Sequence, residues 1–88
     1  MTYTVVLVRD EDGGYCVHVP ALKGCHTEGD TLPEALEMAR DAIECYLGSL
    51  EKHGEPCPPD VHTVTFDWEN GTEALVYRLS VSEAVAVA

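Results

Sequence analysis

The sequence predicts a small α+β domain in which an antiparallel sheet packs against one long helix. Two segments rich in β-branched and aromatic residues flank a turn before residue 20, and an amphipathic stretch follows Thr31. An Asn-Gly pair lies between two further β-rich segments after residue 60. The chain has 88 residues, and independent domains usually need roughly 50 to 200. We therefore expect one domain with the order ββ-β-α-ββ.

Three strands are predicted before the helix. The turn-forming segment Asp10-Glu11-Asp12-Gly13-Gly14 joins the first two strands into a hairpin. Pro20 ends the second strand because proline has no N–H to donate to a ladder, and Gly24 opens a short third strand. The predicted strands are residues 2–9, 15–20 and 25–28.

The helix begins at the capping box Thr31-Leu32-Pro33-Glu34, which places proline in the first turn, where its missing N–H costs little. Apolar residues then recur every three or four positions and form one stripe that we expect to pack on the sheet. The stripe contains Leu32, Ala35, Leu36, Ala39, Ala42, Ile43, Tyr46, Leu47 and Leu50.

The opposite side of this helix is acidic. Its carboxylates, here called the acidic helix face, are Glu34, Glu37, Asp41, Glu44 and Glu51. Solvation is the usual fate of such a face, but Met38 and Cys45 add apolar contact beside the charge, and that mixture suits a protein interface. The candidate partner-binding residues are therefore Glu37, Met38, Asp41, Glu44 and Cys45.

Beyond Gly54, three prolines predict an extended connector up to residue 60. Residues 61–68 alternate apolar and polar, and Asn70-Gly71 then predicts a tight turn into a strand over 73–81. We expect residues 1–60 to form the βββα core, and residues 61–88 to add a C-terminal β-hairpin and tail to the same domain.

Self-association is expected because the first strand carries apolar residues on both faces, whereas one helix covers only one face. The second hairpin is the best candidate to contact another copy in a homodimer or higher oligomer. The candidate contact residues are Val6, Val8, Phe66, Trp68, Leu75 and Tyr77.

The charge balance narrows the classes of partner. The chain has 16 acidic and 5 basic residues, a formal net charge of −11, and no run of Lys or Arg. Unaided binding to phosphate backbones needs several cations on one face, so a basic protein partner is favoured over nucleic acid. The N-terminus has neither the charged segment of a signal peptide nor an apolar run that could span a membrane. We expect a cytoplasmic protein with four free thiols.

Catalytic and metal chemistry is not expected. The possible zinc ligands do not form a C-x-x-C or H-x-x-x-H pair, so ordinary surface or satisfied side chains are favoured, without metal or cofactor. Those residues are Cys16, His18, Cys25, His26, His53, Cys57 and His62. Asp10, Glu37 and Asp67 loosely resemble the carboxylates of a two-metal nuclease, but acids are so frequent in this chain that chance explains them. A small metal-dependent nuclease stays open as an alternative.

Several motifs together resemble the HicB antitoxin family over about residues 3 to 60. They are Gly13-Gly14-Tyr15, Val19-Pro20, Leu22-Lys23-Gly24-Cys25, Gly29-Asp30-Thr31, Glu34-Ala35, and the prolines Pro56, Pro58 and Pro59. The resemblance implies a degenerate ribonuclease-H-like βββα domain without the catalytic carboxylates. It also implies a type II antitoxin that silences a small basic HicA-like mRNA ribonuclease by covering its active-site region.

The resemblance weakens after residue 60. Family members often continue there into a DNA-binding region, whereas this chain continues into a predicted hairpin with one basic residue, Arg78. Operator binding is therefore not expected. An orphan oligomeric HicB-like module without a toxin remains compatible with the sequence.

Overall fold

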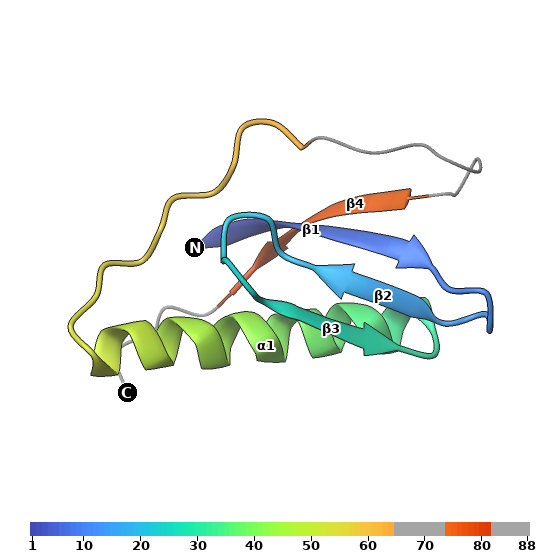
Figure 1. Ribbon diagram of the computed structural model, residues 1–88, viewed down its shortest axis with the longest axis horizontal. Coiled ribbons are helices and arrows are strands. Elements are labelled where there is room, and N and C mark those ends of the chain that lie inside the picture. Colours follow the sequence, from blue (N-terminus) through green and yellow to red (C-terminus); the bar gives the residue numbers. More distant parts are fainter. Residues whose placement is uncertain (65–73, 82–88) are drawn as a thin grey trace.

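A four-stranded antiparallel sheet covered on one face by a single helix forms the described part of the computed structural model, residues 1–64 and 74–81 (Figure 1). The order of the strands in the sheet is β3-β2-β1-β4. The elements are β1 (Thr2–Arg9), β2 (Tyr15–His18), β3 (His26–Gly29), α1 (Leu32–Lys52) and β4 (Ala74–Ser80). The predicted α+β class, with one long helix on an antiparallel sheet, is confirmed.

β1 and β2, the two central strands, form the predicted hairpin. The segments that follow differ in part from the prediction. β3 lies one residue further along than expected. Residues 61–64 form no strand, so the predicted strand over 61–68 is wrong there, and its remainder, with Phe66 and Trp68, lies outside the described residues. β4 forms as predicted and pairs along β1, from Thr2↔Ser80 to Val8↔Ala74.

β1 lies between β2 and β4, and its middle residues are buried on both sides of the sheet. Tyr3, Val5 and Leu7 face α1 and belong to the hydrophobic core. Thr4, Val6 and Val8 alternate with them and therefore lie on the other face, here called the outer sheet face. The core is completed by Val17, Val19, Leu22, Cys25, Ala35, Ala39, Ile43, Leu47, Leu79 and Val81.

Thr31 is the N-cap of α1, as the sequence predicted. The backbone N–H of Glu34 donates to Thr31 Oγ1 at 3.3 Å, which satisfies one of the free donors of the first turn. After Lys52 the helix ends, and Gly54 takes a positive φ of +70°, a conformation that favours glycine. The N-terminal turns of the helix lie close to the sheet because their buried positions, Ala35 and Ala39, are small.

Gly29 is needed where β3 meets α1. A Cβ atom at this position would lie 2.6 Å from the backbone N and Cα of Ala35. We expect Gly29→Ala to lower the free energy of unfolding by about 1 to 3 kcal/mol, because backbone atoms of the helix must shift. Denaturant titration measures this change. Gly48→Ala is the matched control: nothing lies within 4 Å of its added Cβ, so it should leave stability unchanged or raise it by up to about 1 kcal/mol.

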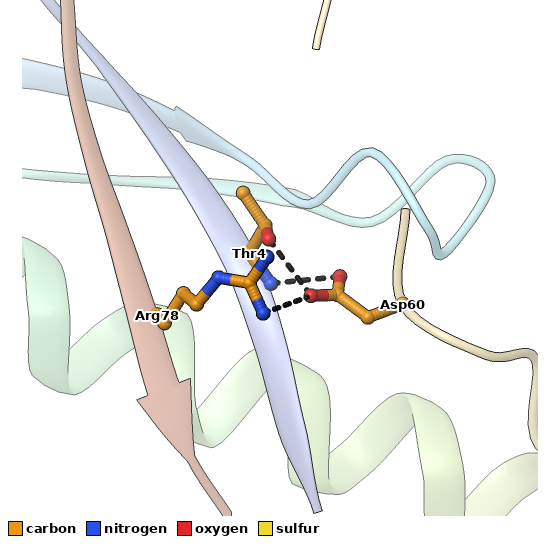
Figure 2. Close-up of polar contacts among 3 residues, drawn as sticks. All are labelled: Thr4, Asp60 and Arg78. Atoms are coloured by element: carbon orange, nitrogen blue, oxygen red, sulfur yellow. Dashed lines mark hydrogen bonds and ion pairs between the residues drawn. The ribbon is translucent and has the colours of Figure 1, made fainter. Parts of the chain in front are cut away.

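The segment after α1 runs back to the sheet and is fastened to β1 (Figure 1). Tyr3 Oη donates to the carbonyl of Pro58 at 2.6 Å. The N–H and the hydroxyl of Thr4 donate to the two carboxylate oxygens of Asp60 at 2.9 and 2.8 Å. Arg78 of β4 completes this cluster with an ion pair to Asp60 at 3.8 Å (Figure 2). We call Thr4, Asp60 and Arg78 the Asp60 clasp.

The Asp60 clasp should make stability depend on pH. Burial alone would raise the pKa of Asp60, but hydrogen bonds from Thr4 and from the Val61 N–H, with the charge of Arg78, lower the pKa below its ordinary value. The stabilisation by the carboxylate is therefore present above the unfolded pKa of about 3.9 and is lost as pH falls through the folded pKa. We expect Asp60→Asn to be less stable than the parent at pH 7, with the difference shrinking below about pH 4. Denaturant midpoints across this range test it, and a difference independent of pH would contradict it.

Candidate partner-binding surfaces

The acidic helix face lies on the side of α1 away from the sheet. Glu37, Met38, Arg40, Asp41 and Glu44 together line a shallow hollow of about 260 Å³, here called the helix hollow. Four of the five predicted partner-binding residues therefore lie together. Cys45 is exposed on the same helix but does not line the hollow.

Arg40 was missed by the sequence analysis. It lies three positions after Glu37 and four before Glu44, so the helical spacing already indicated that it shares their surface. The helix hollow thus carries three carboxylates, one guanidinium and the thioether of Met38, which is 41% exposed. Such a surface can pair with several cations and also form an apolar contact.

The helix hollow is held in place by the buried side of α1. Ala39 and Ile43 are fully buried, so the helix cannot rotate without exposing the core. Tyr46 Oη also donates to the carbonyl of Lys23 at 2.9 Å, which fixes the helix to the loop before β3. The carboxylates of the helix hollow are therefore presented on a rigid support.

A second acidic surface lies at the N-terminal end of the helix. Asp10 and Asp12 of the β1–β2 turn approach Glu28, Asp30 and Glu34, and the five residues line a hollow of about 390 Å³. Of these acids only Glu34 was predicted on a candidate surface, since the others come from the β1–β2 turn, from β3 and from the segment between β3 and α1. Glu51 is exposed near the end of α1.

The residues weighed for metal and nuclease chemistry do not assemble into a centre. Among the residues that the structure describes, no group of three or more His, Cys, Asp or Glu side chains is placed to hold a metal ion. Asp10 and Glu37 line separate hollows, and Asp67 lies outside the described residues. All four cysteines are free thiols, and burial raises the pKa of the Cys25 thiol.

The predicted self-association residues are divided between the two faces of the sheet. The register pairs Val5 with Tyr77 and Leu7 with Leu75, so Leu75 and Tyr77 pack against the core. They therefore lie on the opposite face of the sheet from Val6 and Val8, and their contact with a second copy stays a prediction. Val6 is itself fully buried within the chain, and Val8 is half-buried.

Val76 is the apolar residue that the sequence analysis missed on the outer sheet face. It pairs with Val6 and is 50% exposed. On the same face, at the β2–β3 side, lies a groove of about 610 Å³, here called the outer groove. It is lined by Val8, Cys16, Val17, His18, His26, Thr27 and Glu28.

The fold and these surfaces define a small acidic α+β domain with one helix whose side away from the sheet is acidic. The family of this domain follows from comparison with known proteins. Residues 3–81 match the family model described as the HicB-like antitoxin of bacterial toxin-antitoxin systems, and the chain belongs to this family. The resemblance stated from the sequence motifs is confirmed.

Relatives agree with this assignment. A UPF0150 protein of Thermoplasma acidophilum is 53% identical over 60 residues, which are 68% of this chain and 87% of that protein. Antitoxin HicB 1 of Photorhabdus laumondii is 45% identical over 62 residues, covering 66% of this chain but only 40% of the longer relative. The N-terminal domain of the Burkholderia pseudomallei antitoxin HicB aligns with a TM-score of 0.69 and 26% identity, over 93% of this chain and 99% of that one.

A toxin-antitoxin complex from Streptococcus pneumoniae has a TM-score of 0.79 at 18% identity, covering 96% of this chain and 70% of that one, and this likeness concerns the fold. No helix in the described ranges is both long and apolar enough to cross a membrane.

Proposed function

We propose that the chain is an antitoxin that binds a small basic HicA-type mRNA ribonuclease and neutralises it by masking its active-site surface. The helix hollow is the observation that carries this proposal, since it presents Glu37, Asp41 and Glu44 on a rigid helix of a chain with net charge −11. The family membership supports the antitoxin role. A fold neighbour solved as a HicA3 and HicB3 toxin-antitoxin complex supports the class of partner.

The proposed mechanism is competition for cations. A toxin that cleaves mRNA must present Lys and Arg side chains where the phosphates of its substrate lie. The carboxylates of the helix hollow form charge-assisted hydrogen bonds with such cations, and Met38 adds apolar contact that slows dissociation. When the antitoxin occupies this basic surface of the toxin, RNA can no longer bind there. We infer that the chain acts in the cytoplasm, where the mRNA substrate of the toxin is found.

The fold also suits a binding role. We infer that it is a degenerate ribonuclease-H-like domain, supported by its antiparallel sheet and single packed helix. In this interpretation the chain itself does not cleave nucleic acid. Labelled RNA incubated with the protein and Mg²⁺ or Mn²⁺ tests this point, and specific cleavage would favour the alternative of a small metal-dependent nuclease.

Binding is tested by titrating a purified HicA-type toxin with the protein in a calorimeter. We expect saturation at one toxin for each antitoxin chain. The absence of binding to such a toxin would instead favour an orphan HicB-like module. Because charge pairs carry much of the contact, the affinity should fall as the salt concentration rises.

A further inference from the structure

The pairing of β2 with β3 brings together two histidines that no short motif connects. β2 and β3 lie side by side at one edge of the sheet (Figure 1), and His18 of β2 is the direct partner of His26 of β3. Both side chains are exposed, and both residues line the outer groove of about 610 Å³. Their spacing in the sequence gave no sign of a shared site, because the register of the two strands alone makes them neighbours.

The hydrogen bonds between the two strands show how closely the histidines approach. The Val19 N–H donates to the carbonyl of Cys25 at 3.0 Å, so these two residues are a hydrogen-bonded pair of the antiparallel ladder. Hydrogen-bonded and non-hydrogen-bonded pairs alternate along such a ladder, and His18 with His26 is therefore a non-hydrogen-bonded pair. The Cβ atoms of such a pair lie about 4.5 to 5.5 Å apart on the same face of the sheet. The two imidazoles thus stand next to each other at the outer groove.

We propose that His18 and His26 together chelate one divalent transition-metal ion in the outer groove. Imidazole is a good ligand for Zn²⁺, Ni²⁺ and Cu²⁺. Zn–N distances are about 2.0 to 2.1 Å, so two nitrogens on one ion lie roughly 3 Å apart. Histidine side chains whose Cβ atoms are about 5 Å apart reach this separation by changing their rotamers, without movement of the backbone.

The surroundings of the two imidazoles favour a bound cation. Cys16 and Glu28 are the next pair on the same face of β2 and β3, and both line the outer groove. The carboxylate of Glu28 and the net charge of −11 both attract a cation. No group of three or more His, Cys, Asp or Glu side chains in the described part of the chain is placed to hold an ion, so water fills the other coordination positions. We therefore expect an open site that binds more weakly than a closed structural zinc centre.

The metal site goes beyond the proposed function and does not depend on it. The helix hollow belongs to α1, which packs on the other face of the sheet, so a toxin bound there leaves the outer groove open. The chelated ion would join the edge strand β3 to β2. His18 and His26 come together only when these strands pair, so the ion binds the folded chain in preference to the unfolded one and stabilises it.

Calorimetric titration with NiCl₂ in the presence of excess MgCl₂ tests the site. Mg²⁺ binds carboxylates and not imidazoles, so it competes for the acidic surfaces and leaves the histidine pair free. The parent chain should bind one Ni²⁺. His18→Ala and His26→Ala should each weaken binding by about tenfold or more, because a single imidazole cannot chelate. His62→Ala is the matched control: His62 is exposed but does not line the outer groove, and this variant should bind Ni²⁺ as the parent does.

Thermal denaturation with and without NiCl₂ gives a second readout and shows whether each variant is folded. Ni²⁺ should raise the midpoint of the parent and of His62→Ala, but not that of His26→Ala. Three results would overturn the site: a folded parent that binds no Ni²⁺, folded His18→Ala and His26→Ala variants that bind it as tightly as the parent, or an equal loss of binding in His62→Ala. Cys16→Ser should still bind Ni²⁺, and a site that only this variant abolishes would assign the ion to the thiol instead of the histidine pair.

Discussion

Replacing Ile43 by alanine is expected to lower the free energy of unfolding by about 2 to 4 kcal/mol. Ile43 is fully buried in the middle of α1, where it joins the hydrophobic core between the helix and the sheet. The substitution removes three carbon atoms and leaves a cavity that a backbone already packed closely through Ala35 and Ala39 cannot easily fill. Small domains have total stabilities of only about 5 to 15 kcal/mol, so this variant should lose a large part of its stability.

Urea titration followed by circular dichroism measures the effect. Met38→Ala is the control, because Met38 is 41% exposed and lies on the opposite side of the same helix. Its free energy of unfolding should stay within about 0.5 kcal/mol of the parent value. A midpoint that Ile43→Ala leaves unchanged would show that the apolar stripe of α1 does not hold the helix to the sheet.

Reversing Glu37, Asp41 and Glu44 to lysine together should slow association with a HicA-type toxin by about tenfold or more at low salt. Each reversal changes the charge by two units, so the net charge rises from −11 to −5. The three residues lie in the helix hollow, and lysine there repels the basic surface that the carboxylates attract. Stopped-flow mixing at low salt gives the association rate. At about 1 M salt, where the screening length is about 3 Å, the difference from the parent should largely disappear.

The matched control reverses three other exposed acids, Glu11, Asp12 and Glu55, which brings the net charge to the same value. These residues lie outside the helix hollow. If the control slows association as much as the first variant, net charge alone steers the toxin and the helix hollow is only a solvated surface. All six positions are at least partly exposed, so both variants should remain folded, which circular dichroism verifies.

The helix and its acidic side could be predicted from sequence because local spacing determines them. The capping box at Thr31 and the stripe through Ala35, Ala39 and Ile43 depend on residues three or four positions apart. The same spacing placed Glu37, Asp41 and Glu44 together, and all three line the helix hollow. Arg40 shares that spacing, and a complete reading of charges on the helix would have included it.

The outer sheet face could not be predicted because strand pairing is not local. β4 was expected to pair with residues 61–68, yet it pairs with β1, more than sixty positions away in the chain. Only that register shows that Val76 faces outward while Leu75 and Tyr77 pack against the core. Residues in a strand alternate between the two faces, so the apolar run from Leu75 to Tyr77 did not reveal which side is buried.

The Asp60 clasp was missed for a similar reason. Thr4 and Asp60 are 56 positions apart, and nothing near either residue in the sequence indicates the other. The prolines of the connector predicted its extended form, but the point where it returns to the sheet depends on Tyr3 and Thr4 of the first strand. Contacts of this kind become visible only when the fold has brought both ends together.

The rate at which a HicA-type toxin cleaves mRNA, measured while this protein is added, is the decisive test of the antitoxin function. The toxin is held at a concentration well above the dissociation constant that the calorimetric titration gives for its complex with this protein, and cleavage of a labelled RNA is followed over time. We expect cleavage to fall in proportion to the added protein and to reach background at one chain per toxin, while the variant with Glu37, Asp41 and Glu44 reversed requires a clear excess. Unchanged cleavage at a tenfold excess of the parent protein would contradict the antitoxin function.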